Sequence, residues 1–107
     1  MTHVIVWRFG VPAAQMAEFE RAYGPAGDWV QLFRKSKDYI ASELWRETPE
    51  GAPTRELIYF TIDRWKTAAA YTEFRDKWAG AYAELDGRCL KITSVEKCLG
   101  KFDVVDG

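Results

Sequence analysis

Strand-like and helix-like segments follow one another in the order β-α-β-β-α-β along this chain. That order is typical of the ferredoxin-like split βαβ arrangement, in which a four-stranded antiparallel sheet carries both helices on one face. The 107 residues are enough for one hydrophobic core and too few for a second. We therefore expect an α+β fold and a single domain over residues 1–107.

Four segments have the composition of strands. Residues 3–9 are β-branched and aromatic, and both faces of the segment are apolar apart from Arg8, so we expect a central strand covered on both sides. Residues 55–63 alternate along their length. Their two faces hold Ile58, Phe60 and Ile62 on one side and Leu57, Tyr59 and Thr61 on the other. The other strands are expected at 39–47 and at 95–102, the latter with a bulge at Gly100.

The first long helical pattern is expected over residues 12–23, with Pro12 in its first turn. Its apolar stripe consists of Met16, Phe19 and Tyr23. Beyond this helix, Asp28 and Gln31 resemble a capping box. This pair predicts a short helical turn over residues 28–35 that closes one end of the core.

The second long helical pattern begins after a candidate N-cap, Thr67. We expect it to continue to Ile92 with a kink at Gly80. Its first apolar face consists of Ala68, Tyr71, Phe74 and Trp78. The segment 48–54 holds two prolines and a glycine, so we expect a loop there between two strands of a hairpin.

A sheet with both helices on one face leaves its second face uncovered. Because the first and third strands are apolar on both faces, the second face also requires burial. A second copy of the chain would cover it most simply, so we expect a homodimer with two-fold symmetry.

The charge balance narrows the classes of partner. Fifteen Lys and Arg residues against sixteen Asp and Glu residues leave a formal net charge of −1. Nucleic-acid binders and anionic-membrane binders need a basic surface, so we expect neither partner. No apolar run approaches the about 20 residues of a membrane-spanning helix, and we expect a cytoplasmic protein. Cys89 and Cys98 lie nine residues apart without a CxxC pattern, so we expect no metal site.

Aromatic residues make up 15% of the chain, with five Trp, five Tyr and six Phe. Such side chains bury large areas and prefer packed or ligand-lined surroundings. Three interpretations remain open: an aromatic core, a pocket for a flat organic molecule and a subunit interface.

Three stretches carry a resemblance to a known family: residues 59–78 (YFTIDRWKTAAAYTEFRDKW), residues 22–47 and residues 6–10 (VWRFG). With them the chain resembles the antibiotic biosynthesis monooxygenase domain family of the dimeric α+β barrel superfamily. The resemblance implies a homodimer with a ligand cavity in each subunit, between sheet and helices. It also implies an oxygenase that uses neither metal nor flavin and converts phenols to quinones, so we expect no cofactor.

Three candidate catalytic residues follow. Trp65 matches the tryptophan that the family's oxygenases carry just after the third strand, and Tyr71 matches the tyrosine that the quinone-forming relatives carry six residues later. Arg75 lies four residues beyond Tyr71, so both side chains can face the same way on a helix, and a buried guanidinium favours a phenolate. Each of the three residues also has a structural interpretation. Trp65 and Tyr71 can be core residues, and Arg75 can be a solvated surface charge or part of an ion pair in the dimer.

The family pattern also marks departures. The asparagine of the quinone-forming relatives, four residues before the tryptophan, is Thr61 here. Haem-degrading relatives carry an asparagine on the first strand and a histidine ten residues past the tryptophan, where this chain has Trp7 and Arg75. Haem chemistry is therefore not expected. The candidate substrate-binding residues are Trp7, Tyr59, Thr61, Phe74 and Trp78.

The sequence thus favours a cofactor-independent monooxygenase that acts on a small aromatic or polyketide-like phenolic substrate. With a single histidine, His3, the sequence offers no Ser-His-Asp or Cys-His arrangement for nucleophilic catalysis. Two alternatives share the same cavity. One is a non-catalytic dimeric protein that binds small molecules or serves in a stress response, and the other is a polyketide cyclase or isomerase.

Overall fold

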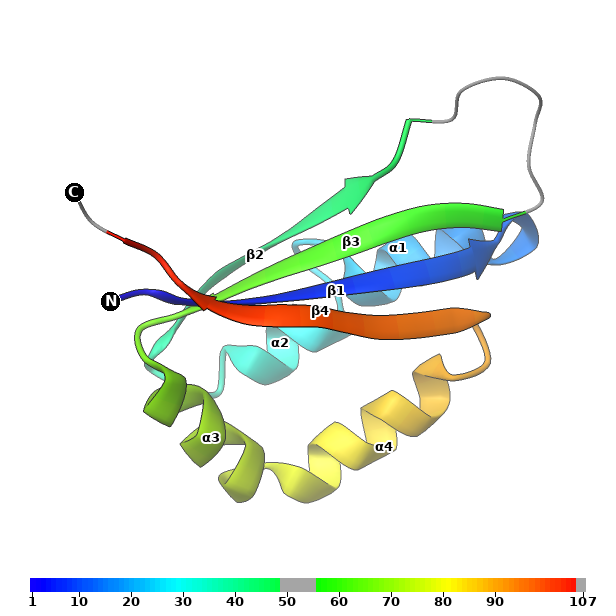
Figure 1. Cartoon of the computed structure of the whole chain (residues 1–107). Coiled ribbons are helices and arrows are strands. Elements are labelled where there is room, and N and C mark those ends of the chain that lie inside the picture. Colours follow the sequence, from blue (N-terminus) through cyan, green and yellow to red (C-terminus); the bar gives the residue numbers. More distant parts are fainter. Residues whose placement is uncertain (49–55, 106–107) are drawn as a thin grey trace.

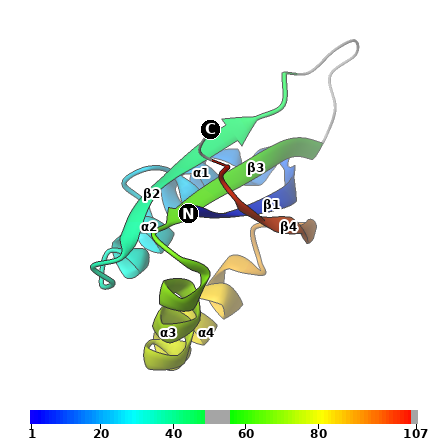
Figure 2. The same ribbon diagram turned by 60° about the vertical axis from the view of Figure 1, so that its left-hand side comes forward.

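The computed structural model describes residues 1–48 and 56–105. They form one four-stranded antiparallel sheet with the strand order β2-β3-β1-β4, and the helices pack on one side of it (Figures 1 and 2). The strands are β1 (His3–Pro12), β2 (Tyr39–Arg46), β3 (Glu56–Trp65) and β4 (Val95–Asp103). The helices are the 3₁₀ helix η1 (Ala13–Gln15), α1 (Met16–Tyr23), α2 (Asp28–Phe33), α3 (Ala68–Lys77) and α4 (Ala79–Cys89). The expected ferredoxin-like α+β fold is confirmed.

β1 is central, as expected, because it pairs with β3 on one side and with β4 on the other. It runs to Pro12, three residues further than the sequence pattern indicated. Pro12 has an extended backbone (φ −56°, ψ 137°) and pairs in register with Glu56. The prediction that Pro12 opens the first helix was therefore wrong. Proline has no backbone N–H to donate to a neighbouring strand, and at the end of a strand this missing donor is tolerated.

The alternation predicted for β3 is confirmed. Tyr59, Thr61 and Trp65 are buried on the face that the helices cover, and they are joined there by Asp63. The strand continues to Trp65, which pairs with both His3 and Tyr39. The candidate loop 48–54 lies outside the described residues from residue 49 onward.

β2 carries one extra residue near its start. Tyr39 pairs with Trp65 and Ala41 pairs with Arg64, so Ile40 has no partner of its own on β3. This bulge places Tyr39 and Ser42 on the same face of the sheet, although they lie three positions apart. A second register shift lies in the pairing of β1 with β4, where Leu99 is the extra residue beside the expected bulge position, Gly100.

The helix boundaries follow the sequence signals in part. Thr67 is confirmed as an N-cap, since its Oγ1 accepts a hydrogen bond of 3.0 Å from the backbone N–H of Ala70. The capping box was wrong: Gly27 is the N-cap of α2, with no side-chain cap bond. The second helical pattern breaks at Trp78 rather than at Gly80, and α4 ends at Cys89 instead of Ile92.

Aromatic side chains fill the core between sheet and helices. Trp65 is 0% exposed, and Phe33, Tyr39, Tyr71 and Phe74 all lie with their ring centroids between 5.1 and 5.5 Å from its own. Edge-to-face and tilted pairs of this kind add about 0.5–1.5 kcal/mol each beyond their burial. The core interpretation of the aromatic content is therefore confirmed for this cluster.

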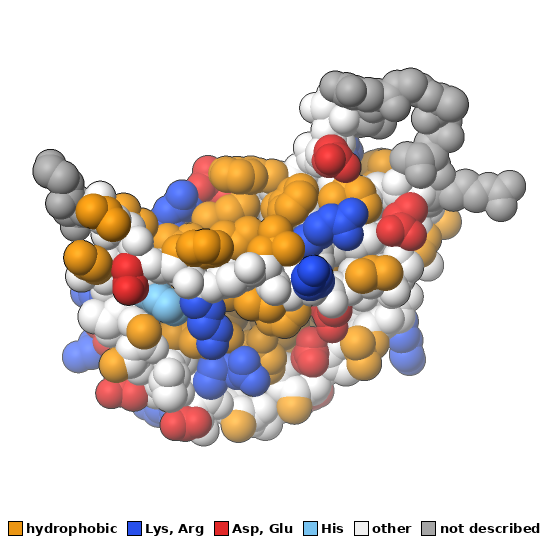
Figure 3. Space-filling model, viewed as in Figure 1, with side chains coloured by type: hydrophobic (Ala, Val, Ile, Leu, Met, Phe, Trp, Pro, Cys, Tyr) orange, Lys and Arg blue, Asp and Glu red, His pale blue; other side chains and the backbone are white. Residues whose placement is uncertain are grey.

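The face of the sheet that the helices leave open is apolar over much of its area. Trp45 is 55% exposed and pairs with Phe60, and Phe102 is 51% exposed and pairs with Val4. Figure 3 shows hydrophobic side chains gathered along the strands in this view. We refer to this surface as the outer face. None of the helices in the described part of the chain is long and apolar enough to span a bilayer.

Candidate functional site

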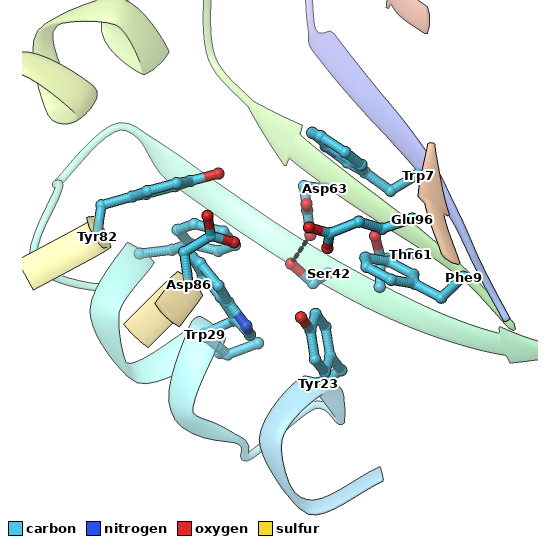
Figure 4. A pocket seen from close by; sticks show the side chains of 12 residues that line it. Trp7, Phe9, Tyr23, Trp29, Ser42, Thr61, Asp63, Tyr82, Asp86 and Glu96 are labelled. Atoms are coloured by element: carbon cyan, nitrogen blue, oxygen red, sulfur yellow. Dashed lines mark hydrogen bonds between the residues drawn. The ribbon is translucent and has the colours of Figure 1, made fainter. Parts of the chain in front are cut away.

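A pocket lies between the helix-covered face of the sheet and the helices α1, α2 and α4 (Figure 4). Its volume is about 50 Å³. One ordered water needs about 10–15 Å³, so the pocket as it stands holds a few waters, and an aromatic ring requires movement of the lining side chains. The lining consists of Trp7, Phe9, Tyr23, Trp29, Val30, Phe33, Ser42, Thr61, Asp63, Tyr82, Asp86 and Glu96.

Flat apolar walls dominate this lining. Trp7 and Phe9 stack on β1, with ring centroids 6.2 Å apart and an interplanar angle of 23°. On the helical side, the Trp29 ring meets the Tyr82 ring edge-on at 4.9 Å. The Trp29 indole Nε1 is buried and has no hydrogen-bond partner among the described residues. A planar ligand would find aromatic surface on both sides of the pocket.

A hydrogen-bonded carboxyl group stands in the floor of the pocket. The Ser42 hydroxyl donates to Asp63 Oδ1 over 2.5 Å, and the Tyr39 hydroxyl donates to Ser42 Oγ over 2.7 Å. Burial raises the pKa of Asp63 to about 6, although the hydrogen bond from Ser42 lowers it. The Asp63 carboxyl can therefore gain and lose a proton near neutral pH.

Two further carboxyl groups line the pocket, Asp86 on α4 and Glu96 on β4. Burial and the nearby charge of Asp86 raise the pKa of Glu96. Burial also raises the pKa of Tyr23 and that of Tyr82 above the ordinary range of a phenol. Within residues 1–48 and 56–105, no group of three or more His, Cys, Asp or Glu side chains could hold a metal ion.

A cationic cluster adjoins the pocket through Tyr82. The Arg75 Nη1 donates to the Tyr71 hydroxyl over 3.1 Å, and its guanidinium carbon lies 3.8 Å from the centroid of the Tyr82 ring. Lys101 Nζ lies 5.5 Å from the centroid of the Tyr71 ring. Neither Arg75 nor Lys101 forms an ion pair with a carboxylate of the described residues. Positive charge therefore stands directly behind one wall of the pocket.

The structure brings some of the sequence-predicted site residues to this pocket and not others. Trp7 and Thr61 line it. Tyr71 contacts both of the other candidate catalytic residues: its ring centroid lies 5.3 Å from that of Trp65, and its hydroxyl accepts the hydrogen bond from Arg75. All three residues lie outside the lining.

The remaining three candidates also lie elsewhere. Phe74 packs in the core against Trp65, and Trp78 is half-buried beneath Lys35, whose Nζ lies 4.8 Å from the centroid of its ring. Tyr59 donates a hydrogen bond of 2.5 Å to Glu20, beside a separate surface hollow.

The polar residues of the pocket were missed by sequence reasoning. Ser42, Asp63, Asp86 and Glu96 come from three different strands and a helix. The sequence did contain one signal for Asp63. It continues the alternation of Tyr59 and Thr61, so an acidic residue stands on a strand face that must be buried, and such a residue indicates a polar site.

Comparison with known proteins finds no matching family model and no matching curated protein. Solved structures do match. SnoaB, a cofactor-independent oxygenase from Streptomyces nogalater, is 18% identical over 99% of this chain and 95% of its own, with a TM-score of 0.76. Rv0793 from Mycobacterium tuberculosis is 14% identical over 100% of this chain and 98% of its own, with a TM-score of 0.66.

A Bacillus cereus protein assigned as an antibiotic biosynthesis monooxygenase is 11% identical over 99% of this chain and 95% of its own, with a TM-score of 0.64. Identities this low establish the fold and leave the activity open. The chain therefore has the fold of the antibiotic biosynthesis monooxygenase-type proteins, which confirms at the level of architecture the resemblance carried by its sequence.

Proposed function

We propose that this protein is a cofactor-independent monooxygenase that acts on a small aromatic or polyketide-like phenolic substrate. The observation that carries the proposal is the aromatic-walled pocket with an ionisable carboxyl group in its floor. The shared fold with SnoaB, whose name describes a cofactor-independent oxygenase, supports it.

The proposed reaction needs little chemistry from the protein itself. An electron-rich substrate loses a proton, and the resulting anion transfers electrons to dioxygen. One oxygen atom becomes a ring carbonyl and the other leaves as water, so that a CH₂ group and O₂ give C=O and H₂O. The protein holds the ring, stabilises the anion and excludes bulk water.

The candidate residues divide between contact and support in this proposal. Trp7 and Thr61 contact the substrate, since both line the pocket. Arg75 and Tyr71 stabilise negative charge through the Tyr82 wall, against which Arg75 lies. Trp65 acts as a positioning residue, because it is fully buried and packs against Phe33 of the lining.

We also propose that two chains associate through the outer face. Trp45, Val95 and Phe102 are each exposed by half or more. An apolar sheet face of this kind is typical of an interface.

The described cysteines, Cys89 and Cys98, are both free, which favours a reducing compartment such as the cytoplasm.

The experiment is oxygen uptake by purified, metal-free protein with a panel of anthrones and hydroquinones. We expect uptake above the buffer rate, with the ketone or quinone as product. Trp7→Ala should change the rate and the preferred ring size, whereas Trp78→Ala, outside the lining, should leave both near wild type. Oxygen uptake at the buffer rate across the whole panel would contradict the proposal.

The small pocket volume supports a second candidate, a non-catalytic protein that binds small molecules. In that case a phenolic ligand raises the melting temperature without oxygen uptake. The proton-exchanging carboxyl of Asp63 also fits a cyclase or isomerase. Product formed equally well under argon would identify that activity.

A further inference from the structure

We propose that Asp63 is the proton acceptor of the pocket, and that it selects ligands carrying a neutral aromatic hydroxyl group. The proposal deepens the proposed function, on which it rests for the identity of the substrate. It does not depend on oxygen chemistry for its test.

The geometry of the carboxyl group carries the argument. Its Oδ1 is held by the Ser42 hydroxyl, which is in turn held by Tyr39, so the side chain is fixed by a chain of two donors. Asp63 lines the cavity, and no other hydrogen bond or ion pair to it exists in the described part of the chain. The second oxygen, Oδ2, is therefore free to accept a hydrogen bond from a ligand.

The other titratable groups of the pocket are less suited to this role. Tyr23 of α1 and Tyr82 of α4 are phenols whose pKa is raised by burial, so they remain protonated. Asp86 of α4 and Glu96 of β4 are carboxyl groups, but neither makes a side-chain hydrogen bond or ion pair with any described residue. Only Asp63 has a fixed orientation at the floor.

The lining residues from the remaining elements carry no further charged group. The lining residues of α2 are Trp29, Val30 and Phe33, and those of β1 are Trp7 and Phe9. Tyr39 of β2 is engaged as the donor to Ser42, and burial raises its pKa. Outside the lining, the nearby charge of Arg34 lowers the pKa of Tyr39, and the Arg75 guanidinium carbon lies 3.8 Å from the centroid of the Tyr82 ring.

The proton step follows from this arrangement. The O–H bond of the bound phenol breaks, its proton forms a bond with Asp63 Oδ2, and the electron pair stays on the ring oxygen. Ser42 continues to donate to Oδ1 throughout. Because burial places the pKa of Asp63 at about 6, the carboxyl is largely ionised at neutral pH and ready to accept.

The same carboxyl group determines what the pocket rejects. Asp63 gives the pocket negative charge above about pH 6. An anionic ligand such as a carboxylate would be repelled, whereas a neutral hydroxyl can donate to Oδ2. The ligand class is thus an uncharged aromatic alcohol.

The test is a binding titration with 2-naphthol, which stays un-ionised on both sides of about pH 6, followed by its fluorescence. Naphthalene serves as the ligand control, because it offers the same rings without the hydroxyl. The variants are Asp63→Asn, which keeps the shape and the acceptor for Ser42, and Asp76→Asn, which makes the same substitution at an exposed position of α3 outside the lining.

We expect 2-naphthol to bind the wild type more tightly above about pH 6 than below it. Asp63→Asn should weaken its binding about ten- to a hundredfold at neutral pH and abolish the pH dependence, as expected for a lost hydrogen bond to a charged acceptor. Asp76→Asn should keep the wild-type pH profile, and naphthalene should bind wild type and Asp63→Asn alike.

Ser42→Ala provides a second approach should Asp63→Asn fail to fold. Since the Ser42 hydroxyl lowers the pKa of Asp63, its removal should move the midpoint of the binding profile to higher pH. Wild-type affinity and pH profile in Asp63→Asn, an unmoved midpoint in Ser42→Ala, or no binding of 2-naphthol by the wild type would each overturn the proposal.

The two proposals can fail separately. Asp63-dependent binding of 2-naphthol without oxygen uptake on any panel substrate contradicts the monooxygenase and supports the acceptor. If the Asp63→Asn variant takes up oxygen at the wild-type rate, the result supports the monooxygenase and contradicts the role of Asp63 as proton acceptor.

Discussion

The Trp65 ring stands edge-on to the Phe33 ring, with 5.5 Å between their centroids and an interplanar angle of 71°. Phe33 lines the pocket and Trp65 does not. The tryptophan that carries the family resemblance therefore reaches the pocket through a neighbour. Its effect on any reaction is expected to be indirect, through the position of the wall.

Trp65→Ala should cost about 3–5 kcal/mol of unfolding free energy, because a fully buried ring is lost from the centre of an aromatic cluster. Urea unfolding followed by circular dichroism measures this. Trp78→Ala is the matched control, and since Trp78 is only half-buried we expect a loss of about 1 kcal/mol. Equal losses in the two variants would argue against a central role for Trp65 in packing.

Asp63→Asn should stabilise the protein at neutral pH. Below about 3.8 the carboxyl is protonated in both the folded and the unfolded chain and contributes nothing. Between about pH 3.8 and about 6 the unfolded chain ionises this carboxyl while the folded chain keeps it protonated, so stability falls; above about 6 both forms are ionised and the loss stays constant. Because asparagine does not ionise, the unfolding free energy of Asp63→Asn should exceed that of wild type by about 1–2 kcal/mol, a figure that allows for the partial exposure of the carboxyl group.

This prediction is checked by urea unfolding of wild type and Asp63→Asn at several pH values. The difference should be present at pH 7 and vanish towards pH 4. The exposed Asp76→Asn serves as control and should show no such trend. A variant less stable than wild type at neutral pH would show that the carboxylate contributes favourable interactions larger than its burial cost.

Charge introduced on the outer face should separate the proposed dimer. Trp45→Glu, and Phe102→Glu in a second variant, each place a carboxylate on a half-exposed apolar surface, where it would have to be buried on association. Light scattering across a range of concentrations should then show a monomer. Leu90→Glu, an exposed apolar residue just past α4, should leave the dimer intact. A monomeric wild type would exclude the interface.

Arg75→Ala should reduce kcat/KM for a phenolic substrate about tenfold, because it removes the positive charge behind the Tyr82 wall. Arg75 is exposed, so the unfolding free energy should change by less than about 1 kcal/mol. Lys77→Ala removes a neighbouring cation on α3, which lies by Trp78, and should have little effect on turnover. Similar kinetics in the two variants would favour a general surface role for Arg75.

The sequence carried the architecture because its main signals are local. Alternation in β3, the Thr67 cap and the apolar character of β1 each depend on neighbouring residues, and the structure bears them out. Element ends were less predictable. Pro12 is compatible with either a helix start or a strand end, and only its pairing with Glu56 decides between them.

The candidate site was predictable only in part. Trp7 and Thr61 were found because the family pattern points to their strand positions. The acidic side chains were not, because two separate strands, β3 and β4, and the helix α4 have to fold together before Asp63, Asp86 and Glu96 share a cavity. No spacing along the chain records that approach.

The unpaired Ile40 determines whether a related protein can form the Tyr39–Ser42–Asp63 hydrogen bonds of the proposed site. Counting by twos along a regular strand would send Tyr39 and Ser42 to opposite faces, yet the inserted residue turns both toward Asp63. Removing Ile40 would leave every polar side chain in the protein and still take Tyr39 away from Ser42. The relay thus depends on chain length as much as on chemistry, and a relative that retains all three side chains but lacks the insertion would not be expected to form it.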